Sequence, residues 1–129
     1  MDSNGLSLPL LLDGATGTQL QERGMPMGAC TEQWVLEHPE VLVGLQREYV
    51  DAGTQVLLAP TFGANRIKLG QRGIQGQVAS YNRQLATLSR EAADGRALVA
   101  AALCAVLLAV PVGSAAAKAV DAAQKKITV

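Results

Sequence analysis

Residues 51–70 read DAGTQVLLAPTFGANRIKLG and combine a helix end, a short apolar run and the loop that follows it. Gly53 closes the first element, and Val56-Leu57-Leu58-Ala59 begins the next. A continuous apolar run without polar alternation is typical of a strand covered on both faces, as in a parallel α/β sheet. Ligands collect at the carboxyl ends of such strands, so residues 60–66 are the first place to expect a functional site.

A second apolar run lies upstream, at Leu8-Pro9-Leu10-Leu11-Leu12, and ends in the turn Asp13-Gly14-Ala15-Thr16-Gly17. We therefore predict a first strand over 8–12 with a glycine-containing turn at its carboxyl end. The two glycines allow backbone to approach a ligand, which Asp13 or Thr16 could orient. The turn matches neither GxGxxG nor a Walker loop, so a phosphate site is weakly supported, and a purely structural turn stays open.

Apolar residues at steps of three and four predict two longer helices. The first begins at His38-Pro39, because proline suits the first helical position, and stops at Gly53. The second carries one apolar stripe and ends at Asp94-Gly95. We also expect a short helix over 18–27, core-edge positions at Trp34 and Val35, and a third strand opening at Ala97-Leu98-Val99-Ala100. The order β-α-β-α-β is typical of right-handed parallel crossovers.

Composition narrows the class of protein. The 129 residues suffice for one domain with a core, and the formal charge is zero without a basic, aromatic-rich run, so we expect no nucleic-acid partner. Cys30 and Cys104 are too far apart for a CxxC metal pair, and the N-terminus lacks the pattern of a signal peptide. We expect reduced thiols and a cytoplasmic location. His38 has no second histidine with which to build a metal site.

Three segments in order resemble one family. LLDGATGTQL (11–20), TEQWVLEHPEVL (31–42) and DAGTQVLLAPTFGANRIKLG (51–70) are together similar to the N-terminal part of the homocysteine S-methyltransferase family. That family includes the homocysteine-binding modules of cobalamin-dependent methionine synthase and betaine–homocysteine methyltransferase. The resemblance covers about residues 8–100.

The resemblance implies a (β/α)8 barrel that binds homocysteine at its carboxyl-end face and transfers a methyl group to the thiol, giving methionine. A zinc ion suits this reaction, since a metal bound to sulfur keeps the thiol deprotonated. The family holds zinc with three cysteines that lie later in its sequence, so we expect no metal ligand and no catalytic residue here. The family uses several methyl donors, and the resemblance assigns none of them to this chain.

The resemblance also implies substrate-binding residues. Asp13 matches the family aspartate beside the homocysteine amino group, because a carboxylate can pair with an ammonium. The amides of Gly14 and Ala15 would face the substrate carboxylate. The remaining positions, Thr61, Phe62 and Asn65, match pocket positions in the loop after the second strand. Thr61 and Asn65 could instead only order that loop. The betaine enzymes carry a tyrosine where this chain has Gly63, which argues against contact with a methyl donor there.

The sequence after residue 100 departs from the family pattern. We therefore divide the chain into 1–100, the N-terminal part of a homocysteine-binding domain, and 101–129, an alanine-rich apolar tail. Three accounts of the tail stay open. It could be a strand and helix, since Val99, Leu103, Val106 and Val110 fall at helical steps. It could be a membrane segment over 97–112, which is short of the ~20 residues that span a bilayer. It could also follow a break in the reading frame.

The predicted fold class is therefore α/β, the N-terminal portion of a (β/α)8 barrel with about three βα units, incomplete because a barrel takes ~200 residues or more. One predicted function is a truncated homocysteine S-methyltransferase that is inactive by itself without the zinc-binding cysteines. The other is a non-catalytic fragment or small binding module, with membrane association through the tail as the less favoured variant.

Overall fold

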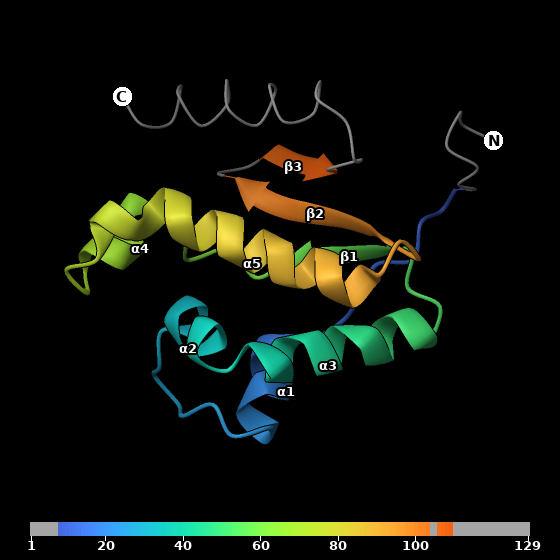
Figure 1. Cartoon of the computed structure of the whole chain (residues 1–129), viewed down its shortest axis with the longest axis horizontal. Coiled ribbons are helices and arrows are strands. Elements are labelled where there is room, and N and C mark those ends of the chain that lie inside the picture. The colour runs from blue at the N-terminus through green and yellow to red at the C-terminus, as the bar shows by residue number, and fades with distance from the viewer. Residues whose placement is uncertain (1–7, 104–105, 110–129) are drawn as a thin grey trace.

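The computed structural model describes residues 8–103 and 106–109. Helices pack on a sheet whose three named strands have the order β1-β2-β3 (Figure 1). In chain order the elements are α1 (Gly17–Glu22), α2 (Thr31–Glu37), α3 (Pro39–Asp51), β1 (Val56–Ala59), α4 (Arg66–Gly70), the 3-10 turn η1 (Gln75–Gln77), α5 (Val78–Ala93), β2 (Leu98–Leu103) and β3 (Val106–Ala109).

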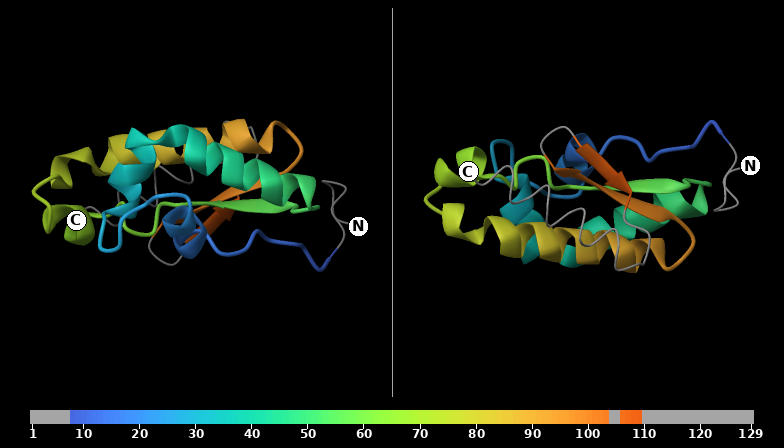
Figure 2. Two further views of the ribbon diagram at one scale, coloured as in Figure 1. Left: turned by 90° about the horizontal axis from the view of Figure 1, so that it is seen from below. Right: turned by 90° about the horizontal axis from the view of Figure 1, so that it is seen from above.

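Strand β1 forms over the apolar run from which it was predicted, and it pairs in parallel with β2. Leu57 and Ala59 belong to the core cluster shared with α3, α5 and β2, and both side chains are fully buried. Figure 2 shows α3 and α5 along one side of the strands and the N-terminal described segment along the other. This parallel pair with helices on one face confirms the α/β class, and its place in an incomplete barrel stays a prediction.

The predicted first strand is reduced to a single parallel bridge between Leu12 and Val56. Pro9 lacks the N–H that a ladder needs, and Leu8 and Leu12 expose 82% and 48% of their surface. The segment nevertheless runs beside β1, since the amides of Gln55 and Val56 both donate to Leu11 O. The prediction was thus right about position and direction, and wrong about length.

Helices α3 and α5 confirm the two longer predicted helices. Helix α3 has Pro39 at its first position, and Gly53 follows its end with a φ of 107°. Helix α5 ends at Asp94, which adopts the left-handed conformation with a φ of 47°. A second core cluster joins α1, α2, α3 and α5, and its fully buried members are Leu20, Val35, Leu42 and Leu85. Burying one such side chain contributes about 1.5–3 kcal/mol.

Two other features differ from the sequence predictions. Helix α1 is six residues long, so the helix expected over 18–27 stops at Glu22. Trp34 and Val35 do contact the core, but they lie on α2, a helix that the sequence analysis did not predict. Helix α2 is held by packing and not by a cap. Val35 is fully buried, and no side chain caps the N-terminus of the helix.

The described part of the tail is a β-hairpin. Strand β3 pairs antiparallel with β2, with Leu103 opposite Val106. The helical part of the strand-and-helix account was therefore wrong for Val99, Leu103 and Val106, because all three lie in these paired strands. Strand β2 also crosses the predicted boundary at residue 100. The antiparallel strand departs from an all-parallel barrel, while residues 110–129, including Val110, lie outside the described residues. Within the described residues no helix is long and apolar enough to cross a membrane.

Candidate functional site

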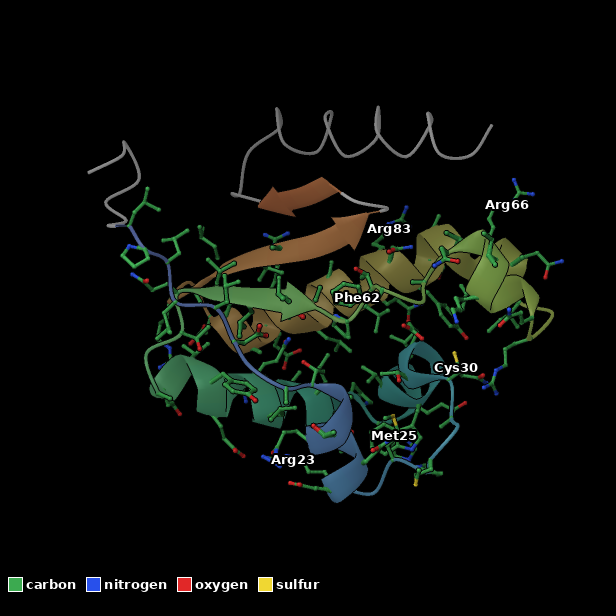
Figure 3. The ribbon with its side chains drawn as sticks, turned by 180° about the vertical axis from the view of Figure 1, so that it is seen from behind. Arg23, Met25, Cys30, Phe62, Arg66 and Arg83 are labelled. Atoms are coloured by element: carbon green, nitrogen blue, oxygen red, sulfur yellow. The ribbon has the colours of Figure 1, made fainter. Side chains whose placement is uncertain are left out.

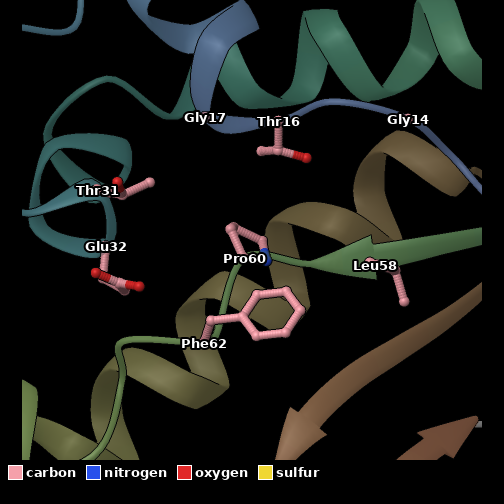
Figure 4. Close-up of a pocket in the computed structure, with 8 residues that line it drawn as sticks. All are labelled: Gly14, Thr16, Gly17, Thr31, Glu32, Leu58, Pro60 and Phe62. Carbon is pink, nitrogen blue, oxygen red and sulfur yellow. The ribbon is translucent and has the colours of Figure 1, made fainter.

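A pocket of about 360 Å³ lies at the carboxyl end of β1. Its walls come from the turn that begins at Gly14, the start of α2 and the loop after β1 (Figure 4). The lining residues are Gly14, Thr16, Gly17, Thr31, Glu32, Leu58, Pro60 and Phe62. The structure therefore brings the two glycine-containing segments of the sequence together at the strand end where a ligand site was expected.

The carboxylate of Asp13 continues the hydrogen-bond ladder of the sheet. The Asp13 amide donates to Val56 O at 3.1 Å, and the chain then turns away from β1. Asp13 Oδ2 accepts a hydrogen bond from Leu58 N at 3.1 Å, in place of a backbone oxygen of a longer strand. The carbonyl group of Leu58 is also bonded, because Gln46 Nε2 of α3 donates to Leu58 O at 3.0 Å. These bonds fix Asp13 at the sheet edge, where it precedes the pocket-lining Gly14 in sequence but is not itself among the lining residues.

Burial leaves Asp13 with unused hydrogen-bonding capacity. Desolvation raises the pKa of its carboxyl above the ordinary 3.8, and the hydrogen bonds from the Leu58 amide and from its own amide oppose that rise. Asp13 Oδ1 is buried and has no hydrogen-bond partner among the residues that the structure describes. A buried carboxylate oxygen in this state can accept a bond from a charged donor at little further desolvation cost.

Tyr49 of α3 holds the turn that follows Asp13. Tyr49 Oη donates to Ala15 O at 2.8 Å. A Cβ atom at Gly14 would lie 3.0 Å from the Tyr49 hydroxyl, so glycine lets the turn sit on the tyrosine ring. Gly14 lines the pocket, whereas Ala15 is not among the lining residues. The contribution of the two amides to substrate binding stays a prediction.

The loop after β1 positions Phe62 at the pocket. Thr61 is 2% exposed, and its carbonyl accepts from Ala64 N at 3.1 Å. Asn65 caps α4, since its Oδ1 accepts from Lys68 N at 2.9 Å, while its Nδ2 donates to Phe62 O at 3.1 Å. Neither Thr61 nor Asn65 lines the pocket. The Phe62 side chain is 69% exposed and stands beyond the tip of β1 (Figure 3).

Glu32 is a charged pocket residue that was not predicted from the sequence. Its side chain is 9% exposed, and its Oε1 accepts a hydrogen bond from Gly63 N at 2.7 Å. Its Oε2 accepts from Cys30 Sγ at 3.6 Å. A Cβ atom at position 63 would lie 2.5 Å from Glu32 Oε1, so only glycine leaves room for this carboxylate. The sequence carried one sign of this contact, namely Gly63 at the position where the betaine enzymes have a tyrosine.

The described residues do not fit a zinc site. They contain no group of three His, Cys, Asp or Glu side chains that could hold a metal ion. Cys30 contacts Glu32, and His38 stacks on Trp34 with a ring-centroid distance of 4.4 Å. Cys104 lies outside the described residues.

The fold and the pocket define an α/β protein with a pocket at the carboxyl end of β1, which pairs in parallel with β2. The family model for homocysteine S-methyltransferase matches residues 10–127. The chain belongs to the homocysteine S-methyltransferase family. This match extends past residue 100, where the resemblance noted in the sequence ends, and the domain division proposed there stays a prediction.

Curated relatives and solved structures agree with the family. The chain is 38% identical to betaine–homocysteine S-methyltransferase 1 of Sus scrofa over 96 residues, which cover 68% of this chain and 34% of the relative. It is 31% identical to methionine synthase of Mycobacterium leprae over 88 residues, 64% of this chain and 7% of the relative. The metallated homocysteine methyltransferase MmuM of Escherichia coli superposes with a TM-score of 0.64 at 27% identity, over 71% of this chain and 36% of that one. The chain thus spans about a third or less of these relatives.

Proposed function

We propose that the pocket at the end of β1 binds homocysteine, and that the chain is the substrate-binding part of a homocysteine S-methyltransferase. The observation that carries this proposal is Asp13 Oδ1, which is buried, has no hydrogen-bond partner within the described residues and belongs to the residue preceding the pocket-lining Gly14. An amino-acid substrate brings an ammonium group that could donate to this oxygen. The names of the relatives and of MmuM support homocysteine as that substrate.

The proposed reaction moves one methyl group. The homocysteine sulfur, as thiolate, attacks the methyl carbon of a donor, so a sulfur–carbon bond forms while the bond from the methyl group to the donor breaks. The electron pair of the broken bond leaves with the donor, and methionine is the product. In this scheme Asp13 orients the substrate through its ammonium group, and the pocket wall around Leu58 and Pro60 excludes water from the apolar stem of the substrate.

We propose that substrate binding and catalysis are separable in this chain. In the family, zinc supplies the acidity that keeps the substrate thiol deprotonated. The described residues form no site for it. We therefore expect the chain to bind homocysteine but not to transfer a methyl group when it is tested alone. This proposal combines membership of the family with the second predicted function, that of a small binding module.

Calorimetric titration of the chain with L-homocysteine tests the proposal. N-acetylhomocysteine, which keeps the thiol and carboxylate but lacks the ammonium, is the matched ligand control. We expect saturable binding of homocysteine and affinity at least about tenfold weaker for the acetylated compound, since hydrogen bonds to charged groups are worth about 1.5–3 kcal/mol. Equal affinity for the two ligands, or no binding by the folded chain, would refute the proposal.

A further inference from the structure

An acid-free stretch of the sequence gives one part of the chain a positive charge. Residues 52–90 contain four arginines and one lysine, but neither aspartate nor glutamate. All five basic side chains are exposed. Residues 8–51 have the opposite excess, with seven acidic and two basic residues. The formal net charge of zero therefore arises from segments of opposite charge, and the surface field is uneven.

The five cations of residues 52–90 form no ion pair within the part of the chain that the structure describes. The ion pairs found there belong to other arginines, namely Arg23, Arg47 and Arg96. Arg72 is held by a hydrogen bond to a neutral group, since its Nη2 donates to Gly28 O at 2.9 Å. These cations are therefore available to an acidic group of another molecule without breaking an ion pair of their own.

Four of the five cations gather at one end of the molecule, and we call them the basic surface: Arg66, Lys68, Arg72 and Arg83. The first two belong to α4, and Arg72 follows the end of this helix. Helix α5 is tied to the start of α4, because Asn82 Nδ2 donates to Ala64 O at 2.7 Å. This bond brings Arg83, the next residue of α5, close to α4. Figure 3 shows Arg66 and Arg83 at this end, with both side chains directed away from the ribbon.

An exposed apolar side chain lies within the basic surface. Ile67 follows Arg66 in α4 and is 77% exposed, whereas Leu69 of the same helix is fully buried. Protein interfaces combine an apolar contact with a polar or charged rim. Proteins that bind single-stranded nucleic acid instead combine cations with aromatic rings that stack on bases, and the basic surface includes no such ring. An exposed isoleucine among cations therefore favours a protein partner.

We infer that the basic surface is a docking site for an acidic segment of another protein, with an apolar side chain that contacts Ile67. A second copy of this chain matches the surface less well, because two of its exposed acids, Glu48 and Asp51, are already paired within the chain. None of the four cations lines the pocket at the end of β1. The inference is therefore independent of the proposed function.

The test titrates the whole chain into a labelled peptide of glutamates around a central leucine and follows fluorescence anisotropy. The matched peptide has glutamine at every acidic position, and an oligothymidylate of equal charge represents nucleic acid. Arg66→Gln combined with Arg83→Gln removes two charges from the basic surface. Arg47→Gln combined with Arg96→Gln is the matched control, because it changes the net charge equally at exposed positions elsewhere.

We expect the acidic peptide to bind at least about tenfold more tightly than the glutamine peptide. The Arg66 and Arg83 double variant should weaken this binding at least about fivefold, and the control double variant by less than about twofold. Ile67→Asn, which keeps every charge, should weaken it at least about threefold through the lost apolar contact.

Three outcomes would overturn the inference. Equal losses in the two double variants would mean that the peptide responds only to net charge, and unchanged binding in Ile67→Asn would remove the apolar contact. Tighter binding of the oligothymidylate than of the acidic peptide would assign the surface to nucleic acid. Sedimentation of the chain alone provides the third check, because self-association that the Arg66 and Arg83 double variant abolishes would assign the surface to a second copy.

Discussion

The Asp13 carboxylate accepts a hydrogen bond from the Leu58 amide at 3.1 Å, although the two residues are 45 positions apart. This bond extends the sheet by one step where the first segment turns away from β1. It also holds this half-buried carboxylate next to the pocket-lining Gly14, with Oδ1 buried and unpartnered among the described residues. One residue thus closes the ladder and presents the group that we propose for substrate binding.

Asp13→Asn should separate these two roles. Asparagine keeps an oxygen that can accept from Leu58 N, so we expect the free energy of unfolding at pH 7 to change by no more than about 1 kcal/mol. The affinity for homocysteine should fall at least about tenfold, because the charge that pairs with the ammonium is lost. Denaturant unfolding and calorimetry measure the two effects. Parallel loss of stability and binding would mean that Asp13 acts only through the fold.

The raised pKa of Asp13 predicts a pH dependence of stability. Because burial raises the folded-state pKa above the ordinary 3.8, the folded chain holds this proton more tightly than the unfolded chain does. The resulting stabilisation is fully present below the unfolded pKa and is lost as pH rises through the folded pKa. Wild type should therefore lose stability relative to Asp13→Asn as pH increases above about 4. Urea unfolding of both proteins across this range provides the measurement, and a constant difference would contradict the assignment.

Homocysteine binding should show the opposite trend over the same range. An ammonium pairs with the ionised carboxylate, so affinity should rise as Asp13 loses its proton. Titrations at several pH values check this prediction in wild type, with Asp13→Asn as the control that should show a flat profile there.

Gly63→Ala should destabilise the chain. The new Cβ would lie 2.5 Å from Glu32 Oε1, so the carboxylate must move and its bond to the Gly63 amide is lost. We expect a cost of about 1–3 kcal/mol. Gly44→Ala is the matched control, because nothing lies within 4 Å of a Cβ there and alanine favours a helix, for an expected gain of about 0.5–1 kcal/mol. In a Glu32→Ala background the effect of Gly63→Ala should largely disappear, and persistence of the full cost would exclude this contact as its cause.

Asn65 variants should distinguish loop order from substrate contact. Asn65→Ala removes the cap of α4 and should cost about 1 kcal/mol. Asn65→Asp keeps the oxygen that accepts from Lys68 N but cannot donate to Phe62 O. We expect Asn65→Asp to retain most of the stability and to change the affinity for homocysteine by less than about threefold. If Asn65→Asp instead keeps the stability and weakens homocysteine binding strongly, the residue contacts the substrate directly.

Local patterns predicted the elements that carry their own signals. Strand β1 was predictable from four apolar residues between Gly53 and Pro60, and α3 from Pro39 at its start. The approach of the turn at Gly14 to the loop at Phe62 was also predictable, since parallel strands end at the same edge of a sheet.

The features that were missed depend on contacts between distant residues. Glu32 lies 31 positions from Gly63, and a glutamate in a short helix gives no sign that it is buried. The antiparallel β3 was hidden because an alanine-rich apolar run fits a helix and a buried strand equally well. The predicted strand over 8–12 was too long, since its apolar pattern does not reveal that β1 offers only four residues for pairing.

The most direct test of the account is a titration of the isotope-labelled chain with L-homocysteine, followed by amide chemical shifts in two-dimensional NMR. The account predicts saturable shifts at Gly14, Leu58 and Gly63, which surround the pocket or hold its carboxylates, and much smaller shifts in the Asp13→Asn variant. Amides at the far ends of α3 and α5 should stay unchanged. A folded spectrum that homocysteine leaves unaltered, or shifts that cluster away from the end of β1, would contradict the central claim that this pocket is the homocysteine site.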